Sequence, residues 1–182
     1  AIIWPPRRDC MLAGSAMGFA MRVLFLALTA FWLTACATAQ PGPAWTAIEI
    51  SEGACFGTCP IYTIRVTPDD RYELNGERFT RTSGETTGTL EAGSFQRLAA
   101  ILQAHDAESL PADITPGNPD ACGRGIMSDL PDFRLGLTSG GGRQVIAWYP
   151  GCAGSPYRDA LSQIREEVRQ VYDHETLIAP KR

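Results

Sequence analysis

The sequence predicts an α+β fold, in which an antiparallel β-sheet of about five to seven strands carries two helices on one face. Several segments alternate apolar and polar residues with a period of two, as strands with one buried face do. Residues 92–104 and 155–171 repeat their apolar residues with the spacing of an amphipathic helix. Strands and helices do not alternate regularly along the chain, so a doubly wound parallel sheet is not expected.

The first strands of this sheet are expected before residue 91. Residues 45–50 and 61–66 alternate clearly, and the turn Pro68-Asp69-Asp70 sends the chain back through a third strand. We expect that third strand to stop at Asn75-Gly76, a pair typical of turns. Residues 78–82 and 85–90 are rich in threonine and predict a separate second hairpin through Ser83-Gly84.

The first helix is expected over residues 92–104, where one stripe consists of Phe95, Leu98, Ala99 and Leu102. A long irregular segment, residues 113–128, follows it. Segments of this length inside a small domain are often functional or covalently fixed.

A further hairpin is predicted from the alternating residues 133–137 and 145–149, joined through Gly140-Gly141-Gly142. Ser155 and Pro156 suit the N-cap and first position of the second helix. Its buried face should contain Leu161, Ile164, Val168 and Val171. We expect the chain after Tyr172 to fray, with residues 176–182 as a flexible tail.

The N-terminal part of the sequence has the layout of an export signal. Residues 1–20 suit no folded element and indicate an upstream or misassigned start, whereas residues 21–35 combine Arg22 with an apolar run, as a signal peptide does. The motif Leu33-Thr34-Ala35-Cys36 resembles the lipobox of bacterial lipoproteins, in which the cysteine is lipidated. An ordinary signal peptide cleaved near Ala39 is the alternative.

This resemblance implies a cellular location and a division of the chain into segments. It places the mature protein in the bacterial cell envelope, attached to a membrane through lipid at Cys36. Ala37 follows the cysteine instead of aspartate, which in such lipoproteins favours the outer membrane, with the domain facing the periplasm. Residues 36–45 would form a loose tether that is rich in small residues and proline, and residues 46–175 a single α+β domain.

Charge excludes one class of partner. The chain carries a net charge of −4, and the part after residue 35 is more acidic still. The sequence contains no run of basic residues and one lysine, Lys181, so nucleic-acid binding is not expected. The expected partners are the membrane, through Cys36, and an unknown envelope protein or small ligand.

The expected domain contains four cysteines: Cys55, Cys59, Cys122 and Cys152. An even number in an exported domain predicts two disulfides, for which three connectivities exist. We favour Cys55–Cys59 with Cys122–Cys152, because the second pair flanks a hairpin that brings its ends together. Loop entropy suggests about 3 to 4 kcal/mol of stabilisation for the longer loop and about 2 kcal/mol for the shorter.

The stretch Cys55-Phe56-Gly57-Thr58-Cys59-Pro60 allows three interpretations. The favoured one is a structural disulfide before a strand. A second is a thiol-redox or Cu(I) site, because Cys-x-x-x-Cys-Pro resembles the motif of Sco-type copper chaperones and thiolates suit Cu(I). In those proteins the motif leads into a helix, whereas here a strand follows. A third, a four-cysteine zinc site, would compete with disulfide formation in an oxidising compartment.

No residue set predicts catalysis or a cofactor. The two histidines, His105 and His174, are expected to be exposed at a helix end and in the tail, which leaves a Ser-His-Asp triad without support. Residues 129–132 read as a turn before a strand. Arg124 is a candidate anion contact that reads more simply as a surface residue.

Three stretches together resemble a bacterial domain-of-unknown-function family, number 6438. They are the Cys-Phe-Gly-Thr-Cys-Pro-x-Tyr stretch ending at Tyr62, the Tyr72-x-Leu74-x-Gly76 strand, and Ser128-Asp129-Leu130-Pro131-Asp132-Phe133. The resemblance covers residues 47–171. It implies secreted proteins or lipoproteins of this fold and no known activity, and its pattern does not include Cys122 and Cys152.

The sequence therefore predicts a lipid-anchored periplasmic domain with a non-enzymatic binding or structural role. The alternative is a thiol-redox or Cu(I)-handling protein that uses Cys55 and Cys59.

Overall fold

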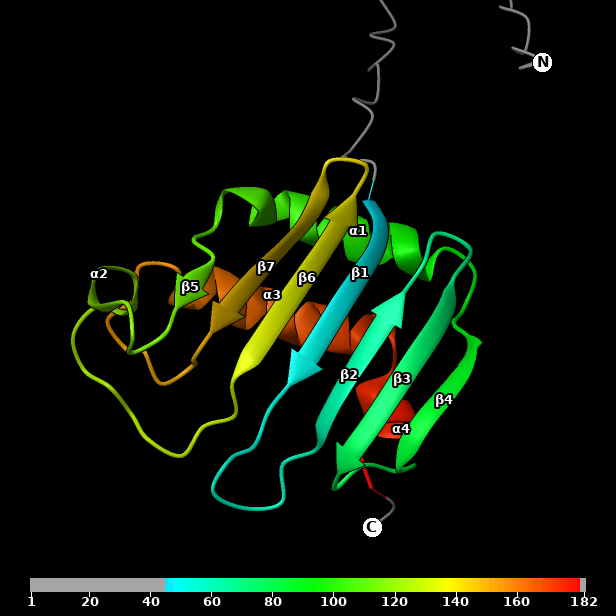
Figure 1. The fold of residues 1–182 in the computed structure, drawn as a ribbon, viewed down its shortest axis with the longest axis horizontal. Helices are drawn as coiled ribbons and strands as arrows, with labels where there is room; N and C mark the ends of the chain where they lie inside the picture. Colours follow the sequence, from blue (N-terminus) through cyan, green and yellow to red (C-terminus); the bar gives the residue numbers. More distant parts are fainter. Residues whose placement is uncertain (1–44, 181–182) are drawn as a thin grey trace, which may run out of the picture. The chain divides into compact units, whose positions relative to one another are not determined.

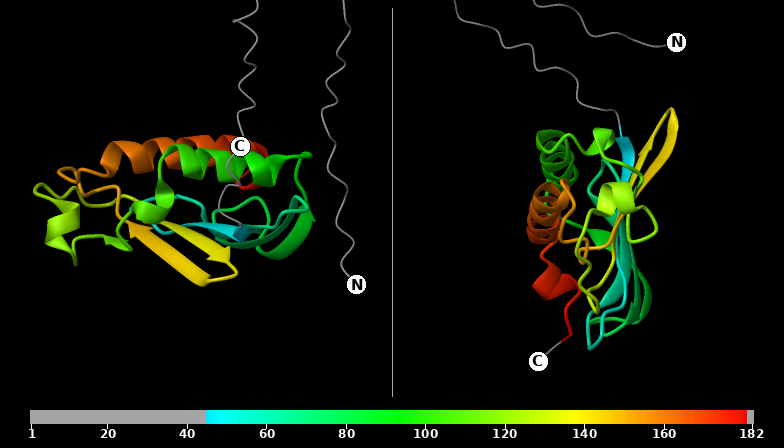
Figure 2. Two further views of the ribbon diagram at one scale, coloured as in Figure 1. Left: turned by 90° about the horizontal axis from the view of Figure 1, so that it is seen from above. Right: turned by 90° about the vertical axis from the view of Figure 1, so that its left-hand side faces the viewer.

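A computed structural model describes residues 45–180 of the chain. The predicted start, signal peptide, lipidated Cys36 and tether up to residue 44 lie outside the described residues. In the described part, one seven-stranded sheet has the order β4-β3-β2-β1-β6-β7-β5, and its helices cover one face (Figures 1 and 2). All strand pairs are antiparallel except β5 with β7. The predicted α+β class is confirmed.

The strands alternate between a buried and an open face of the sheet. Their bounds are β1 Trp45–Glu52, β2 Ile61–Val66, β3 Arg71–Arg78, β4 Gly84–Thr89, β5 Asp113–Ile114, β6 Phe133–Ser139 and β7 Gly142–Trp148. In β2, Tyr62, Ile64 and Val66 are buried beneath the helices, whereas the residues between them are partly exposed. This is the period-2 pattern that the sequence predicts.

Two long helices form the second layer. They are α1, Ser94–Ala104, and α3, Arg158–Val171, and they lie side by side on the same face of the sheet (Figure 2). Phe95, Leu98 and Leu102 of α1 are buried, as are Leu161, Ile164 and Val168 of α3. None of the helices within residues 45–180 combines the length and apolar character that crossing a bilayer requires.

The predicted second hairpin is wrong in its first strand. Instead of stopping at Asn75-Gly76, β3 continues to Arg78, and β4 pairs with β3 itself, with Gly76 opposite Gly84. Gly76 serves packing and not a turn, since a side chain there would collide with the backbone of Thr82 and the side chain of Thr80. The chain turns at residues 79–83, where Phe79 has a φ of 55°.

The helix starts and the tail also differ from expectation. Ser155 is not the N-cap of α3, which begins at Arg158 after Tyr157. Its hydroxyl donates to the carbonyl of Ala121 at 2.7 Å and accepts from the Tyr157 N–H at 3.3 Å. The chain after Tyr172 does not fray. It forms a short helix, α4, His174–Leu177, whose first turn is capped by the Asp173 carboxylate, and Ile178 beyond it is fully buried.

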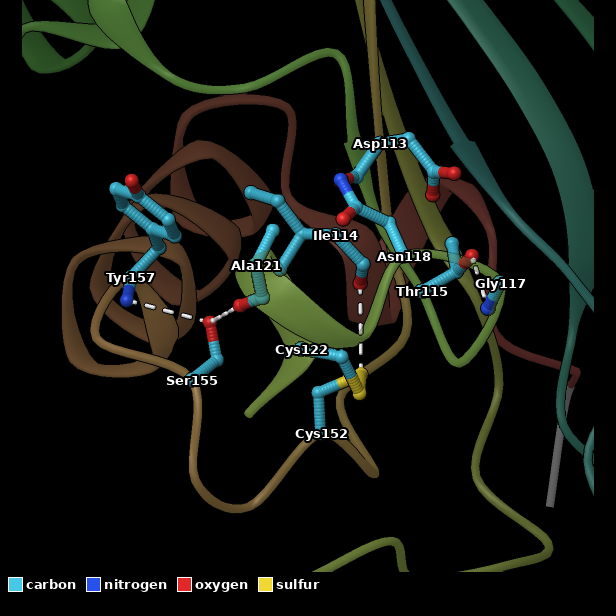
Figure 3. The surroundings of a disulfide bond; sticks show 10 residues. All are labelled: Asp113, Ile114, Thr115, Gly117, Asn118, Ala121, Cys122, Cys152, Ser155 and Tyr157. Carbon is cyan, nitrogen blue, oxygen red and sulfur yellow. Dashed lines mark hydrogen bonds between the residues drawn. A yellow bond between two sulfur atoms is a disulfide. The ribbon is translucent and has the colours of Figure 1, made fainter. Parts of the chain in front are cut away.

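The long segment between α1 and β6 is fixed by short elements and a disulfide. It contains a 3₁₀ turn, η1, Ala107–Ser109, then β5 and the short helix α2, Pro119–Cys122. Figure 3 shows the fully buried Cys122–Cys152 bond that joins α2 to the chain after β7. The Asn118 amide donates to the carbonyl of Asp113 at 2.9 Å, which holds the segment against β5.

Candidate functional site

The β1–β2 loop, residues 53–60, contains the second disulfide, Cys55–Cys59. The structure thus has the cysteine pairing that the sequence favours. The ring closes through Gly57, whose N–H donates to the Cys55 carbonyl at 2.9 Å. Phe56 projects from this ring with 89% of its surface exposed, and Cys55 and Cys59 are partly exposed.

The loop rests on the segment that precedes β6. The Gly53 N–H donates to the carbonyl of Asp132 at 2.9 Å, and the Phe56 N–H donates to that of Asp129 at 3.3 Å. The two stretches are adjacent because β1 and β6 are neighbours and Glu52 lies opposite Phe133. Two of the three sequence stretches that resemble a known family therefore meet at one place in the fold.

The large apolar side chains that remain exposed gather at one end of the sheet. Within residues 45–180 they are Phe56, Phe79, Ile126 and Met127. Each belongs to a loop where β1 or β3 ends or β6 begins, which is the lower end in Figure 1 and is called the loop end below. Trp45, the first residue of β1, lies at the opposite end. The molecule therefore presents its exposed apolar residues far from the point where the N-terminal segment joins.

A buried polar network lies directly beneath the loop end. Glu52, the last residue of β1, is 3% exposed and faces α3. One of its oxygens accepts hydrogen bonds from Arg169 Nε at 2.6 Å and from the Tyr62 hydroxyl at 3.1 Å. The other accepts from Arg165 Nη2 at 2.5 Å and from Arg169 Nη2 at 2.6 Å. The sheet and helix layers are thus joined through one carboxylate.

The network extends to the C-terminal segment. The hydroxyls of Tyr62 and Tyr172 share a hydrogen bond of 2.7 Å. The ring of His174 lies 5.6 Å from that of Tyr62 and 6.4 Å from that of Tyr172, measured between centroids. His174 is 8% exposed, and within the described residues its Nε2 has no hydrogen-bond partner. The expectation that His174 is exposed is wrong, because α4 begins at His174 and places its ring against those of Tyr62 and Tyr172.

The protonation states within the network follow from burial and charge. Burial by itself would raise the pKa of Glu52, but hydrogen bonds and charge from Arg165 and Arg169 outweigh it and hold that pKa below its usual value. Burial raises the pKa of both Tyr62 and Tyr172, so both hydroxyls stay protonated. Burial, and then the charge of Arg169, lowers the pKa of His174, so its imidazole is neutral at pH 7. The network therefore combines one ionised carboxylate with two arginines, two neutral tyrosines and a neutral histidine.

Glu52 was missed by sequence reasoning although a signal was present. It follows Ile48 and Ile50 at the same spacing of two, so the strand pattern puts its carboxylate on the buried face. A buried carboxylate requires a positive partner. Arg165 and Arg169 supply it from positions i and i+4 beside the apolar stripe of α3.

The other candidate residues do not join this site. Arg124 is exposed in the segment after α2. His105 is partly buried at the end of α1, with Nε2 3.6 Å from a Glu167 oxygen.

A groove of about 790 Å³ lies between α1 and α3, and another of about 440 Å³ lies on the open sheet face. Within residues 45–180 no three histidine, cysteine or acidic side chains come together in a way that could hold a metal ion.

The Glu52 network should dominate the stability of the loop end. We expect Glu52→Gln to lower the free energy of unfolding by about 3 to 5 kcal/mol, because two partly buried guanidinium groups lose their buried counter-charge. Urea denaturation followed by circular dichroism measures this. The matched control is Glu73→Gln, which breaks the exposed pair of Glu73 with Arg65 and should cost about 0 to 1 kcal/mol. Equal losses for the two variants would contradict the assignment.

His174 should make stability depend on pH. Its pKa in the folded chain lies below the ordinary 6.5, so the unfolded chain binds a proton first as the pH falls. Its contribution is complete above pH 6.5 and declines below it, by at most about 1.4 kcal/mol per pH unit. His174→Phe keeps a ring and removes the proton site, so its unfolding free energy should decline less steeply below pH 6.5 in urea titrations. Superimposable pH profiles would show that this histidine is not the titrating group.

Comparison with known proteins agrees with the family resemblance. No curated protein matches the chain. The family described as a domain of unknown function, DUF6438, matches residues 46–172, which include both sheet edges, both long helices and all four cysteines of the domain. This match covers most of the chain and the whole arrangement around Cys55–Cys59 and Glu52. The chain therefore belongs to the DUF6438 family.

Proposed function

We propose that this protein is a lipid-anchored binding domain of the bacterial cell envelope, held in the membrane through Cys36 and directed toward the periplasm. The signal-like residues 21–35 and the lipobox-like motif that ends at Cys36 support the address. More than one lipid chain would be needed for a lasting anchor, as in lipoproteins of that kind. The proposed role is non-enzymatic.

The observation that carries the binding role is the exposure of Phe56. Phe56 is 89% exposed and lies at the loop end with three other exposed large apolar residues, and exposed apolar patches are typical of binding surfaces. Phe56 lies between two disulfide-bonded cysteines, and its own N–H is held by the Asp129 carbonyl. The loop therefore keeps its shape before binding, which lowers the entropy lost on association. Buried aromatic anchors supply much of the affinity in protein interfaces.

The position of the loop on the domain supports its availability to a partner. β1 runs from Trp45 to Glu52, next to the loop. Eight residues of strand span about 26 Å. The loop therefore lies about one strand length from Trp45, where the tether would join the domain, which would leave it free for a protein or ligand in the periplasm.

A second candidate function is thiol exchange or Cu(I) binding at Cys55 and Cys59. One observation favours it: these two cysteines are partly exposed, whereas Cys122 and Cys152 are fully buried. Among the cysteines that the structure describes, an external reductant would therefore reach this bond first. Reduction would yield two thiolates of the kind that bind Cu(I).

The binding role predicts a specific contact at Phe56 in living cells. A photo-crosslinking amino acid at position 56 should join the protein to a defined partner, because this side chain would be buried in the complex. The matched control is the same amino acid at Gln96, an exposed position of α1. Adducts are detected by immunoblotting and identified by mass spectrometry. Equal labelling at both positions, or none at position 56, would rule out this loop as the binding surface.

Fractionation of the same cells tests whether the protein is attached to a membrane through lipid. Cys36→Ser should move the protein from the membrane fraction to the soluble fraction, because the lipid acceptor is lost. If the variant still fractionates with membranes, the lipid anchor is wrong, whatever the crosslinking shows.

The thiol candidate predicts selective reduction. In a buffer of reduced glutathione, Cys55–Cys59 should open while Cys122–Cys152 stays closed, and the opened protein should retain one Cu(I) per chain. Alkylation with mass spectrometry locates the free thiols, and Cys55→Ser/Cys59→Ser is the control for copper. A Cys55–Cys59 bond that survives glutathione would refute this candidate and leave the disulfide a structural one.

A further inference from the structure

The two edges of the sheet are protected very differently. One edge is β5, a strand of two residues, and the buried Cys122–Cys152 bond holds the segment that follows it (Figures 1 and 3). A very short, covered edge strand is a common way to prevent pairing with other chains. The opposite edge is β4, and it has no such protection.

The β4 edge is regular and open. It pairs with β3 over six consecutive positions, from Arg71 opposite Thr89 to Gly76 opposite Gly84, without a bulge. Its sequence, Gly-Glu-Thr-Thr-Gly-Thr, contains no proline or lysine and one charge, Glu85. Among residues 45–180, only β3 forms hydrogen bonds to β4. Every device that keeps natural edge strands apart is therefore missing except a single carboxylate.

We propose that β4 pairs antiparallel with β4 of a second copy of this chain, so that two sheets join into one. A two-fold axis perpendicular to the sheet closes both open edges in one step and leaves the dimer with two protected β5 edges. A foreign strand would close the edge of one copy only. The proposal does not depend on the lipid anchor or on the binding role of Phe56.

Charge limits the choice of register. In antiparallel pairs, residues directly opposite each other point to the same face. Glu85 opposite Glu85 is disfavoured by like-charge repulsion. With Thr87 opposite Thr87 on the axis, each Glu85 faces Thr89 of the other copy. The exposed face of the joint then has one threonine pair, two Glu85–Thr89 pairs and no like charges opposite each other. Threonine pairs across strands are favourable. The interface is small, so the dimer should be weak and concentration-dependent.

Crosslinking of the full chain tests the pairing. Thr87→Cys places two thiols opposite each other on the axis, so mild oxidation should give a disulfide-linked dimer on a non-reducing gel. Gln96→Cys, exposed on α1, is the matched control and should remain monomeric. A dimer yield no higher than the control would overturn the proposal. Crosslinking of Thr87→Cys to another envelope protein would also overturn it and assign the edge to a foreign strand.

Opposite charges at position 89 provide a second test. With Thr87→Cys present, Thr89→Lys faces Glu85 of the other copy and should raise the dimer yield, whereas Thr89→Glu should lower it. Each contact occurs twice by symmetry, so we expect a change of about 2-fold to 30-fold in the association constant. Within one copy, Thr89 lies opposite Arg71, so effects on the monomer have the reverse sign. If the dimer yield is the same in both Thr89 variants as in Thr87→Cys alone, or shifts in the same direction in both, the proposed pairing of β4 strands is wrong.

Discussion

The carboxylate of Glu52 is the point on which the two layers of this domain depend. It ends the central strand β1, and it accepts hydrogen bonds from two arginines of α3 and from the hydroxyl of Tyr62. Tyr62 in turn connects it to Tyr172 and to the segment that continues into α4. Apolar burial could hold α3 on the sheet at many positions along the strands. A bidentate pair with fixed geometry allows one position, so the network sets how the helix layer lies over the loop end.

The register of the strands at Glu52 explains why two of the stretches that resemble the family come together. Glu52 lies opposite Tyr62 in β2 and opposite Phe133 in β6, so the three strands are aligned at the residue where the β1–β2 loop begins. The Cys55–Cys59 ring and the segment before β6 then lie next to each other and are joined by backbone hydrogen bonds. A shape that depends on main-chain contacts tolerates many side chains. The Phe56 side chain, which is exposed, is therefore not needed for these contacts.

Predictions from the sequence are correct where the spacing of apolar residues matches the buried face of a strand or helix. They are wrong where a residue is needed for a contact with a distant part of the chain. The strand β2, the β6–β7 hairpin and the buried stripes of α1 and α3 follow the predicted patterns. Gly76 reads as a turn residue next to Asn75, but its lack of a side chain is needed for the close approach of residues 80–82, which no local pattern reveals. The prediction of a fraying tail was wrong for a similar reason. The helix α4 has only four residues and is held by a distant one, Arg81, whose backbone N–H donates to the carbonyl of Ile178. The lipidation site lies outside the described residues and stays a prediction.

The energetics of the loop end limit what the Cys55–Cys59 bond contributes. A ring of this size restricts the unfolded chain by only about 2 kcal/mol, less than the cost of breaking a buried ion pair such as that of Glu52. The hairpin register and the Glu52 network already hold β1 against β2 without the disulfide. The bond is therefore not needed to keep the strands together. Its effect is confined to the loop itself, where it fixes the backbone on both sides of Phe56 and, in the proposed binding role, would set how that side chain meets a partner.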